Sequence, residues 1–599
     1  MNNGYMGRIL FVNLSTSEIT EEPLEEKICR DFIGGYGLGA RILYSRQKAG
    51  VDPLGPENML GFISGPLTGT PIPTGSRYIV VGKSPLTGGW GDSNSGGYFG
   101  PYLKFAGFDA IFFTGISPRP VYLILDNAKA ELKYAADLWG KDTYETEDLL
   151  EKEYGQQSRV ACIGPAGEKL SLISGILTDH GSLAARSGLG AVMGSKKLKA
   201  VVVRGNMEVN IFDKTAAANV RNERIDFWKN SPGPMGGLSD LDLMRKYGTS
   251  WSTYIACHSG DSPVKNWGGV GVIDFPDRSN LNPDVLFTYV EKGHACWHCP
   301  KVCKGIIKAG NGEYNYEGGV HRPEYETLSA FGPNCANNNL EAIIMANDIC
   351  NRAGIDTISA GTTIGFAIEL YENGILTKND TDGLELRWGN HQAMVAMTRK
   401  LVKREGIGDI LADGVKKAAE TIGKGAQQYA VHIGGQELGM HDPKLSRPGR
   451  LDAARYQMDA TPGRHTQNFG PSNFQSHVVG SAGLCNFGAW GGSLLVALNA
   501  VTGFNFTAAD VLKTGERIVN IRHSFNLREG LNELNWPVHP RIVGNPPQTT
   551  GPLANVTADI QAQDYWSLGA LDWDRVTSKP SKAKLISLGL DDIAKDLWP

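Results

Sequence analysis

The pattern of apolar residues changes near residue 207, and this change constrains the fold more than any other feature of the sequence. Between residue 8 and about residue 206, short β-branched and aromatic runs, such as RILFVNL, RYIVVGKSP and KAVVVRG, are separated by Gly, Pro and Asn, which is typical of strands. Helical signals then dominate to residue 599, with a weaker break near 423–425. The sequence therefore predicts an α+β protein with a β-sheet-rich domain at 1–207 and two mainly α-helical domains at 208–423 and 424–599.

Length and charge exclude several classes of protein. A chain of 599 residues is too long for a single hydrophobic core. With 59 Lys and Arg against 63 Asp and Glu, the composition indicates neither nucleic acid nor an anionic membrane surface as a partner. The N-terminus lacks the pattern of a signal peptide, and no run reaches the roughly 18 apolar residues of a spanning helix. We therefore expect a cytoplasmic protein without membrane insertion.

Two helices can be predicted from caps and periodicity. The segment 337–354 begins with Asn residues, ends at Gly354 and has apolar positions at 343, 346, 350 and 353. The segment 408–423 ends at Gly423 and has apolar positions at 411, 415, 418 and 422. Each pattern predicts a helix with one buried stripe.

Three cysteines lie in the eight residues CWHCPKVC: Cys296, Cys299 and Cys303. A C-x2-C-x3-C spacing places three thiolates in one loop, as a [4Fe-4S] cluster needs, and the fourth ligand can come from a distant part of the chain. Zinc is disfavoured because no second C-x2-C or H-x3-H pair follows at finger-like spacing. The nine cysteines are odd in number and scattered, so they do not indicate a disulfide scaffold.

Two further segments carry a resemblance to a known family. GSAGLCNFGAW contains Cys485 in a turn flanked by Gly, and NRAGIDTIS, residues 351–359, has a similar form. Both resemble the paired D-x-x-G-L-[CD] motifs of the tungsten-dependent aldehyde ferredoxin oxidoreductases. Other blocks, among them GPLTGTPIPTGSRYIVVGKSPLTG, ARSGLGAVMGSKKLKAVVVRG, RPEYETLSAFGPNCA and GMHDPK, look like that family in the family's order. The resemblance extends over effectively the whole chain.

The resemblance implies a specific set of cofactors. In this family the N-terminal sheet domain is the base for a tungsten (or molybdenum) bis-pterin cofactor, a magnesium ion bridges the pterin phosphates, and two helical domains cover them. The cysteine of the second paired motif is the fourth ligand of a [4Fe-4S] cluster. By resemblance, Cys485 therefore completes the ligand set of Cys296, Cys299 and Cys303.

The resemblance also implies residues that bind the pterins. Arg77 and Arg186 suit the phosphates, because a guanidinium can donate two parallel hydrogen bonds to a phosphate. Asn94, Gly96 and Gly97 resemble the loop that approaches the phosphates and magnesium, where glycine leaves room for a ligand. The paired motifs contribute Asn351, Gly354, Asp356, Gly483 and Leu484. The family has Asp at the first position of each motif, where this chain has Asn351 and Gly480, so these pterin contacts differ.

Two blocks match the family's acid–base pair. His441 in GMHDPK and Glu326 in RPEYE occupy the positions beside the metal, and counting back from the first paired motif favours Glu326 over Glu324. An isolated Glu or His would more often be a surface residue, so these roles rest on the resemblance. Cys335 is expected to be a core thiol rather than a group that approaches the metal.

The resemblance implies the oxidation of a small aldehyde to a carboxylic acid, with electrons leaving through the [4Fe-4S] cluster to ferredoxin or a ferredoxin-like subunit. The chain has no G-x-G-x-x-G fingerprint between a strand and a helix, so coupling to NAD or flavin requires another subunit in a hetero-oligomer; a homo-oligomer stays open as well. One alternative is the catalytic subunit of a tungsten-dependent benzoyl-coenzyme A reductase. An alternative of another class is an electron-transfer protein that carries only the cluster.

Overall fold

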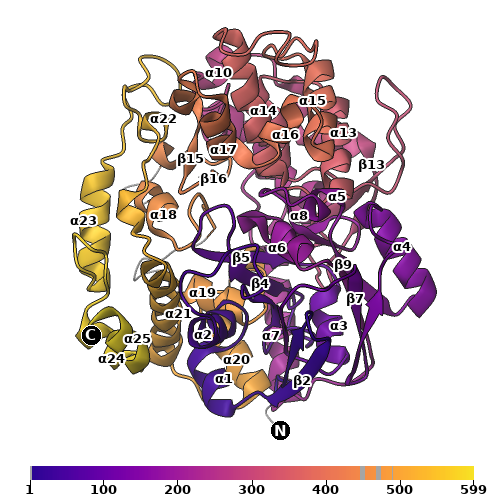
Figure 1. The fold of residues 1–599 in the computed structure, drawn as a ribbon, viewed down its shortest axis with the longest axis vertical. Coiled ribbons are helices and arrows are strands. Elements are labelled where there is room, and N and C mark those ends of the chain that lie inside the picture. Colours follow the sequence, from indigo (N-terminus) through magenta and orange to yellow (C-terminus); the bar gives the residue numbers. More distant parts are fainter. Residues whose placement is uncertain (1–2, 446–451, 467–473, 489) are drawn as a thin grey trace.

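The computed structural model describes residues 3–445, 452–466, 474–488 and 490–599. Its N-terminal third contains two six-stranded mixed sheets (Figure 1). The first has the order β2-β1-β6-β3-β4-β5, with β1 Arg8–Asn13, β2 Glu18–Pro23, β3 Leu60–Ser64, β4 Tyr78–Lys83, β5 Trp90–Ser95 and β6 Ala110–Thr114. The second has the order β11-β10-β9-β12-β7-β8, with β7 Val121–Asp126, β8 Lys129–Tyr134, β9 Ser158–Cys162, β10 Ile176–Thr178, β11 Ser182–Ala184 and β12 Leu198–Arg204.

The two sheets pack face to face. Phe62 and Val80 of the first sheet share one buried cluster with Leu123 and Val201 of the second. Within the sheets, β1 pairs with β6 and β7 with β12 in parallel, and the other ladders are antiparallel. Helices cover both outer faces, so the central strands are buried on both sides. This double burial explains why their sequences are continuous apolar runs rather than alternating ones.

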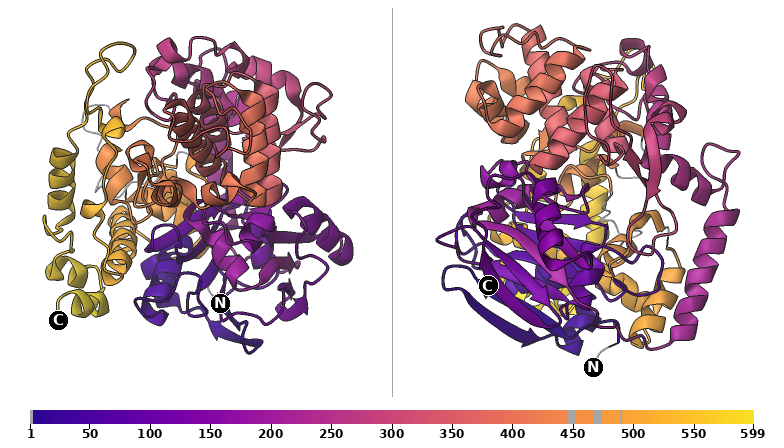
Figure 2. Two further views of the ribbon diagram at one scale, coloured as in Figure 1. Left: turned by 45° about the horizontal axis from the view of Figure 1, so that its top comes forward. Right: turned by 90° about the vertical axis from the view of Figure 1, so that its right-hand side faces the viewer.

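Helices make up most of the remaining structure (Figures 1 and 2). Within the sheet region lie α1 Glu26–Phe32, α2 Gly35–Arg46, α3 Phe99–Phe105, α4 Thr143–Tyr154, α5 Pro165–Glu168 and α6 Leu189–Ser195. The middle region has α7 Lys214–Asn230, α8 Asp240–Tyr247, α9 Thr253–Ser259, α10 Gly271–Asp274, α11 Pro283–Tyr289, the hairpin β13 Val290–His294 and β14 Lys304–Ile307, α12 Tyr325–Phe331, α13 Leu340–Ala353, α14 Thr357–Glu372, α15 His391–Lys403, α16 Ile407–Leu411 and α17 Gly414–Ile422. The last region has β15 His432–Ile433, β16 Gln436–Glu437, α18 Asp452–Met458, α19 Gln475–Ser481, α20 Ser493–Thr502, α21 Ala508–Arg528, α22 Pro540–Val543, α23 Ile560–Leu571, α24 Lys582–Ser587 and α25 Asp591–Leu597. The predicted α+β class, sheets first and helices after, is confirmed.

The outer face of the first sheet is covered by helices from opposite ends of the chain. Ile79 and Phe112 share a buried cluster with Leu43 of α2 and with Val478 and Ile521, which lie on α19 and α21. On the outer face of the second sheet, α4 packs against β9. The helices α12 to α17 surround a separate core above the sheets (Figure 1). The two paired motifs thus lie in different helical layers. The motif that begins at Asn351 lies in the layer above the sheets, and the motif that ends at Cys485 lies in the layer that covers the first sheet.

Both predicted helical segments form. The predicted positions 411, 415 and 418 of the second segment are buried, whereas the first segment does not have a single buried stripe. The helix α13 is capped by Asn339 and Gly354, and it is buried almost all round because other helices enclose it. The second segment divides into α16 and α17 at Gly414, which adopts a φ of 83°. The break lets the Glu437 carboxylate accept a hydrogen bond from the first turn of α17, where the helix dipole favours negative charge.

A buried ionic network joins the first sheet to α21. The guanidinium of Arg522 donates to Asp92 at 2.8 Å and to Asp459 at 3.0 Å, and Arg464 donates to Asp92 at 2.7 Å. All four side chains are almost completely buried. The network therefore holds β5, which carries Asn94, against the C-terminal helices.

Removing Arg522 is expected to destabilise the protein strongly. Arg522→Met leaves buried carboxylates with one cation fewer, which costs about 3–5 kcal/mol of unfolding free energy. The midpoint of denaturant unfolding measures this loss. Arg204→Met is the control, because Arg204 forms an exposed 3.9 Å pair with Asp126 worth about 0–1 kcal/mol. Equal midpoints for the two variants would show that the buried network does not stabilise the fold.

No helix in the described ranges combines the length and the apolar character that a membrane span requires.

Candidate active site

The cysteine triplet lies in the connection of a two-stranded hairpin. Cys296 and Cys299 follow β13, and Cys303 directly precedes β14. The loop turns sharply, with a positive φ at His298 and at Val302. Cys296 is buried, whereas Cys299 and Cys303 are partly exposed, and all three are free thiols. The local sequence thus folds into one compact loop that presents three sulfur atoms.

Cys485 reaches this loop from the turn after α19. Its amide donates to the carbonyl of Thr74, and its sulfur accepts a hydrogen bond of 3.0 Å from Arg77. Burial, and then the neighbouring Cys296 and Cys485, raise the pKa of the Cys299 thiol to about 12. A Cβ on Gly96 would lie 2.9 Å from the Cys296 sulfur and 3.4 Å from the central carbon of the Arg77 guanidinium, so the guanidinium that donates to Cys485 lies beside the triplet. The structure therefore brings Cys485 to the triplet, as the resemblance implies.

Two buried cations border the four thiols. Burial disfavours the Cys296 thiolate, but the charges of Lys304 and Arg77 outweigh it and lower the pKa of Cys296. Arg77 also donates to Asn94 at 3.2 Å, and its Nε is buried without a hydrogen-bond partner among the described residues. Arg77 therefore connects Cys485 with the predicted cofactor loop on β5.

The glycines of that loop have a role within the protein itself. A Cβ on Gly96 would lie 2.9 Å from the Cys296 sulfur, and one on Gly97 would lie 1.9 Å from a carboxylate oxygen of Asp179. Gly97 also has a φ of 89°, and its carbonyl accepts from the amide of Trp297. Both glycines therefore seat the cysteine loop, and their predicted approach to a pterin stays a prediction.

Arg186 forms an ion pair in this structure. Its guanidinium donates to Asp356 at 2.7 Å and to the carbonyl of Glu437. Asp356 caps α14 by accepting from the amide of Ile358 at 3.0 Å. The two predicted cofactor residues Arg186 and Asp356 are thus brought together.

The remaining residues of the paired motifs lie at helix ends. Asn351 is buried in the last turn of α13, and Gly354 ends that helix in the left-handed conformation. Gly483 has a φ of 85°, and a Cβ there would lie 1.9 Å from the Thr68 hydroxyl. Leu484 is fully buried. Gly483 and Leu484 thus belong to the turn that precedes Cys485, whereas Asn351 and Gly354 lie at the end of α13.

Gly480 departs from the family motif for a steric reason. A Cβ at Gly480 would lie 2.3 Å from the ring of Tyr36. Tyr36, on α2, is buried beside Asp92, and burial followed by the charge of Asp92 raises its pKa. The aromatic ring therefore takes the space that a larger side chain at residue 480 would need.

Glu326 and His441 face each other across the helical domains. Glu326 lies in the first turn of α12, and its Oε2 accepts from the amide of Met440 at 2.7 Å. The Nε2 of His441 is 3.8 Å from Glu326 Oε1, and its Nδ1 is 2.7 Å from the Asp261 carboxylate. Tyr325 stacks on the His441 ring at 4.4 Å. The imidazole is thus held from two sides, as a general acid or base requires.

The environment shifts the pKa of both groups upward. Burial raises the pKa of Glu326, and the charge of His441 opposes this only in part. Burial would lower the pKa of His441, but the hydrogen bond to Asp261 and the charge of Glu326 outweigh it and raise that pKa. The pair therefore holds a proton more readily than the free side chains do.

Glu324 has a different location. It is the N-cap residue of α12 and accepts a hydrogen bond from Thr249. Its charge raises the pKa of Cys303, after the larger effect of burial. Glu324 therefore lies towards the thiols, and Glu326 is the glutamate beside His441.

Sequence reasoning missed two residues of this site. Asp261 is 180 residues from His441 along the chain. His465 places its Nδ1 3.5 Å from Glu326 Oε1, and the donor atoms of Glu326, His441 and His465 lie within 4.8 Å of one another. Neither residue belongs to a block of the family resemblance or to a periodic pattern, so nothing in the sequence separated them from other polar residues.

Two buried polar atoms in this cluster lack a hydrogen-bond partner among the described residues. They are Glu326 Oε1 and His465 Nδ1. Buried polar atoms are normally satisfied by protein, water or ligand. The donor set therefore fits a polar group bound between the sheet domain and the helices.

Cys335 belongs to the helical core. It is 1% exposed, and its thiol donates weakly to the carbonyls of Ala330 and Gly361. It packs as a small apolar side chain.

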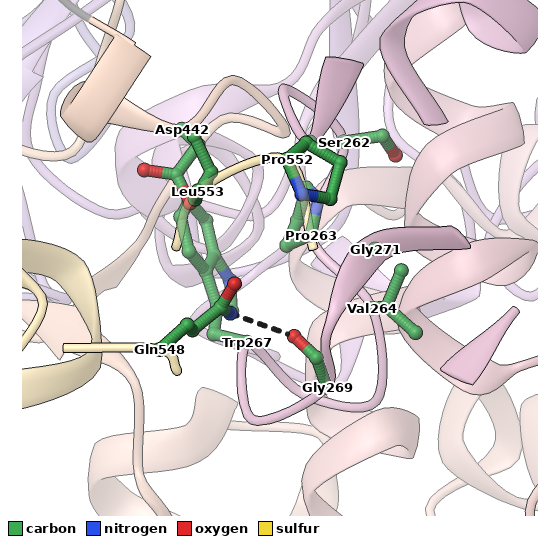
Figure 3. A pocket seen from close by; sticks show the side chains of 11 residues that line it. Ser262, Pro263, Val264, Trp267, Gly269, Gly271, Asp442, Gln548, Pro552 and Leu553 are labelled. Atoms are coloured by element: carbon green, nitrogen blue, oxygen red, sulfur yellow. Dashed lines mark hydrogen bonds between the residues drawn. The ribbon is translucent and has the colours of Figure 1, made fainter. Parts of the chain in front are cut away.

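A small cavity lies near the His441 loop (Figure 3). It offers about 10 Å³ to the centre of a water molecule and is lined by Asp442, Ser262 and Trp267, among others. Gln548 closes one side by donating to the carbonyl of Gly269 at 3.0 Å. The indole Nε1 of Trp267 is buried without a hydrogen-bond partner among the described residues. The cavity suits one ordered water and is too small for an organic substrate.

Two family models match most of the chain. Residues 9–205 match the model "Aldehyde ferredoxin oxidoreductase, N-terminal domain", and residues 228–590 match "Aldehyde ferredoxin oxidoreductase, domains 2 & 3". The chain belongs to the aldehyde ferredoxin oxidoreductase family. The resemblance stated from the sequence is confirmed, and the protein is an oxidoreductase.

Relatives within this family cover nearly the whole chain. The tungsten-containing aldehyde ferredoxin oxidoreductase of Pyrococcus furiosus is 36% identical over 98% of this chain and 99% of its own length. The enzyme of the same name from Thermococcus kodakarensis is 37% identical over 92% and 93%. A solved structure, the active site complex BamBC of benzoyl coenzyme A reductase with 1,5-dienoyl-CoA, has a TM-score of 0.85 at 25% identity and covers 100% of this chain and 99% of that one.

Proposed function

We propose that this protein is a tungsten-pterin enzyme that oxidises aldehydes to carboxylic acids and passes the electrons through a [4Fe-4S] cluster to ferredoxin or a ferredoxin-like subunit. The observation that carries the proposal is the His441–Glu326 pair, in which Asp261 contacts the other ring nitrogen of His441. The names of the relatives at 36–37% identity support tungsten and an aldehyde substrate.

The four cysteines would hold the cluster. Cys296, Cys299 and Cys303 supply three ligands and Cys485 the fourth, which is the number that a [4Fe-4S] cluster requires. Arg77 and Lys304 would offset the negative charge of the cluster and its thiolates. Hydrogen bonds and charges of this kind raise the reduction potential of a cluster.

Few of the residues predicted to bind the pterins have hydrogen-bond donors that are not already used within the protein. Arg77 Nε is buried without a hydrogen-bond partner among the described residues, which leaves it free to donate to a pterin. Arg186 would contribute only by sharing its donors with Asp356. When bound, the cofactor supplies the two-electron chemistry at its metal. The magnesium ion between the pterin phosphates follows from the resemblance alone.

The protein side of the reaction is proton transfer and positioning. His441, whose pKa is raised by the hydrogen bond to Asp261, would donate a hydrogen bond from Nε2 to the substrate oxygen. The Glu326 carboxylate would accept a proton at Oε1 as the acid forms. Tyr325, stacked on His441, keeps the imidazole oriented.

Metal analysis and substrate screening of anaerobically purified protein test the proposal. We expect about one tungsten and about four iron atoms per chain, together with pterin and reduction of ferredoxin by a panel of aldehydes. Iron without tungsten or molybdenum, or zinc alone, would contradict the cofactor assignment.

The benzoyl-coenzyme A reductase alternative is favoured by one observation, the BamBC structure with a TM-score of 0.85. This chain has Gly480, packed against Tyr36, where the family motif has Asp. The difference changes the expected pterin contacts and is therefore compatible with this alternative. Dearomatisation of benzoyl-coenzyme A by reduced ferredoxin, in a preparation that oxidises no aldehyde, would establish this alternative and reject aldehyde oxidation.

A further inference from the structure

We propose that Tyr36 binds a pterin of the tungsten cofactor and supplies the polar contact that Gly480, without a side chain, cannot make. This inference rests on the pterin cofactor of the proposed function, and it holds for either substrate considered above. Tyr36 lies far from Gly480 along the chain, and no pattern in the sequence indicated it. Its role follows from the position of its ring in the folded protein.

The first turn of α2 packs directly against the second paired motif. The amide of Gly37 donates to the Ser481 hydroxyl at 3.3 Å. A Cβ on Gly35 would lie 2.8 Å from the Cα of Ser481, and a Cβ on Gly480 would lie 2.3 Å from the Tyr36 ring. The two backbones are therefore in contact, and the aromatic ring fills the space into which a side chain at residue 480 would extend.

A chain of polar contacts joins Tyr36 to the fourth cysteine. Arg77 donates to the Cys485 sulfur at 3.0 Å and to the Asn94 side chain at 3.2 Å. Burial, and then the charge of Asp92, raise the pKa of the Tyr36 phenol, whereas nearby cations and a hydrogen bond with Asn94 lower it in part. The phenol thus lies beside Asn94 on β5, the strand that carries the predicted cofactor loop.

Several polar atoms near Tyr36 have no partner in the part of the chain that the structure describes. Arg522 lies over the Tyr36 ring at 5.6 Å and donates to Asp459 Oδ1 at 3.0 Å. The other carboxylate oxygen, Asp459 Oδ2, is buried and unpaired, as are Arg464 Nε and Arg77 Nε. Buried polar atoms are normally satisfied by protein, water or ligand. Two donors and an acceptor suit a heterocycle that has N–H groups and a carbonyl oxygen, as a pterin has.

A neutral phenol is suited to this contact. A phenol both accepts and donates a hydrogen bond, whereas a carboxylate only accepts. The raised pKa of Tyr36 keeps its proton in place at neutral pH. The glycine at residue 480 therefore exchanges one binding side chain for another, and the motif keeps a polar contact to the cofactor.

Tyr36→Phe tests the contact, because the ring and its packing remain and only the hydroxyl is lost. We expect pterin to leave the holoenzyme about 10-fold faster in mild denaturant, with the iron content of the wild type. The fluorescence of the oxidised pterin measures the release. Tyr134→Phe, at an exposed tyrosine on β8, is the control and should retain pterin as the wild type does. A lower unfolding midpoint with wild-type pterin release would assign Tyr36 a structural role and overturn the proposal.

An exchange of side chains gives a second test. Gly480→Asp should lose pterin, because the new side chain meets the Tyr36 ring. The double variant Tyr36→Ala/Gly480→Asp vacates that space for the carboxylate and should retain more pterin than either single variant. A double variant that retains no more pterin than Gly480→Asp would overturn the proposal, and Tyr36→Phe decides if the Gly480 variants do not fold. Pterin missing from the wild type would contradict the proposed function as well, whereas equal retention by all variants would overturn only the role of Tyr36.

Discussion

His441→Asn is expected to lower kcat by about 10²–10⁴-fold while the tungsten and iron contents stay unchanged. The reason is that His441 Nε2 lies 3.8 Å from Glu326 Oε1, and the hydrogen bond to Asp261 raises the pKa of the His441 imidazole. Single-turnover measurement of the chemical step with an aldehyde is the direct assay. Glu326→Gln should produce a loss of similar size, and the double variant should lose little more, because the two residues act as one unit.

The pH profile gives a second test of the same pair. The raised pKa of Glu326 means that the carboxylate is lost as the pH falls through that value, so activity declines on the acid side at a higher pH than for a free glutamate. The raised pKa of His441 keeps the imidazolium to a higher pH than a free histidine, so the alkaline decline shifts upward. Near-normal activity of His441→Asn across this range would reject its catalytic role.

Cys485→Ala is expected to remove most of the iron from the protein. Without its fourth thiolate, one iron of the cluster lacks a protein ligand. The Arg77 guanidinium also loses the sulfur that accepts its hydrogen bond. Iron analysis and the electron paramagnetic resonance signal of the reduced cluster measure the loss. Pterin and tungsten should remain, because the role proposed for Cys485 is in the cluster and not in the acid–base pair.

Cys350→Ala is the matched control for this variant. Cys350 is a fully buried core thiol on α13, so its removal costs stability through a small cavity but leaves the iron content unchanged. An intact four-iron signal in Cys485→Ala would show that another group is the fourth ligand. Loss of iron in both variants would show that the cluster responds to general destabilisation.

The apolar pattern predicted the sheets because strands buried on both faces need continuous β-branched and aromatic runs. Such runs as RYIVVGKSP and KAVVVRG became β4 and β12, both central strands. The same reasoning failed for the stripe of α13, since periodicity cannot show that other helices will cover a polar face. It also missed the break before α17. There the Glu437 carboxylate, contributed by β16, lies so close to Gly414 that a Cβ at this left-handed position would clash with it.

The sequence by itself predicted the candidate site residues that are carried by local spacing and by family blocks: the C-x2-C-x3-C loop, Cys485, Glu326 and His441. These assignments need only neighbouring residues along the chain or a matched motif. Only the tertiary structure decided that Asp261 and His465 join the pair, that Asp356 holds Arg186, and that Tyr36 excludes a side chain at Gly480. The physical reason is that burial, charge and steric fit at each of these positions come from segments far apart in the sequence, which become neighbours only when the sheets and helical layers pack together.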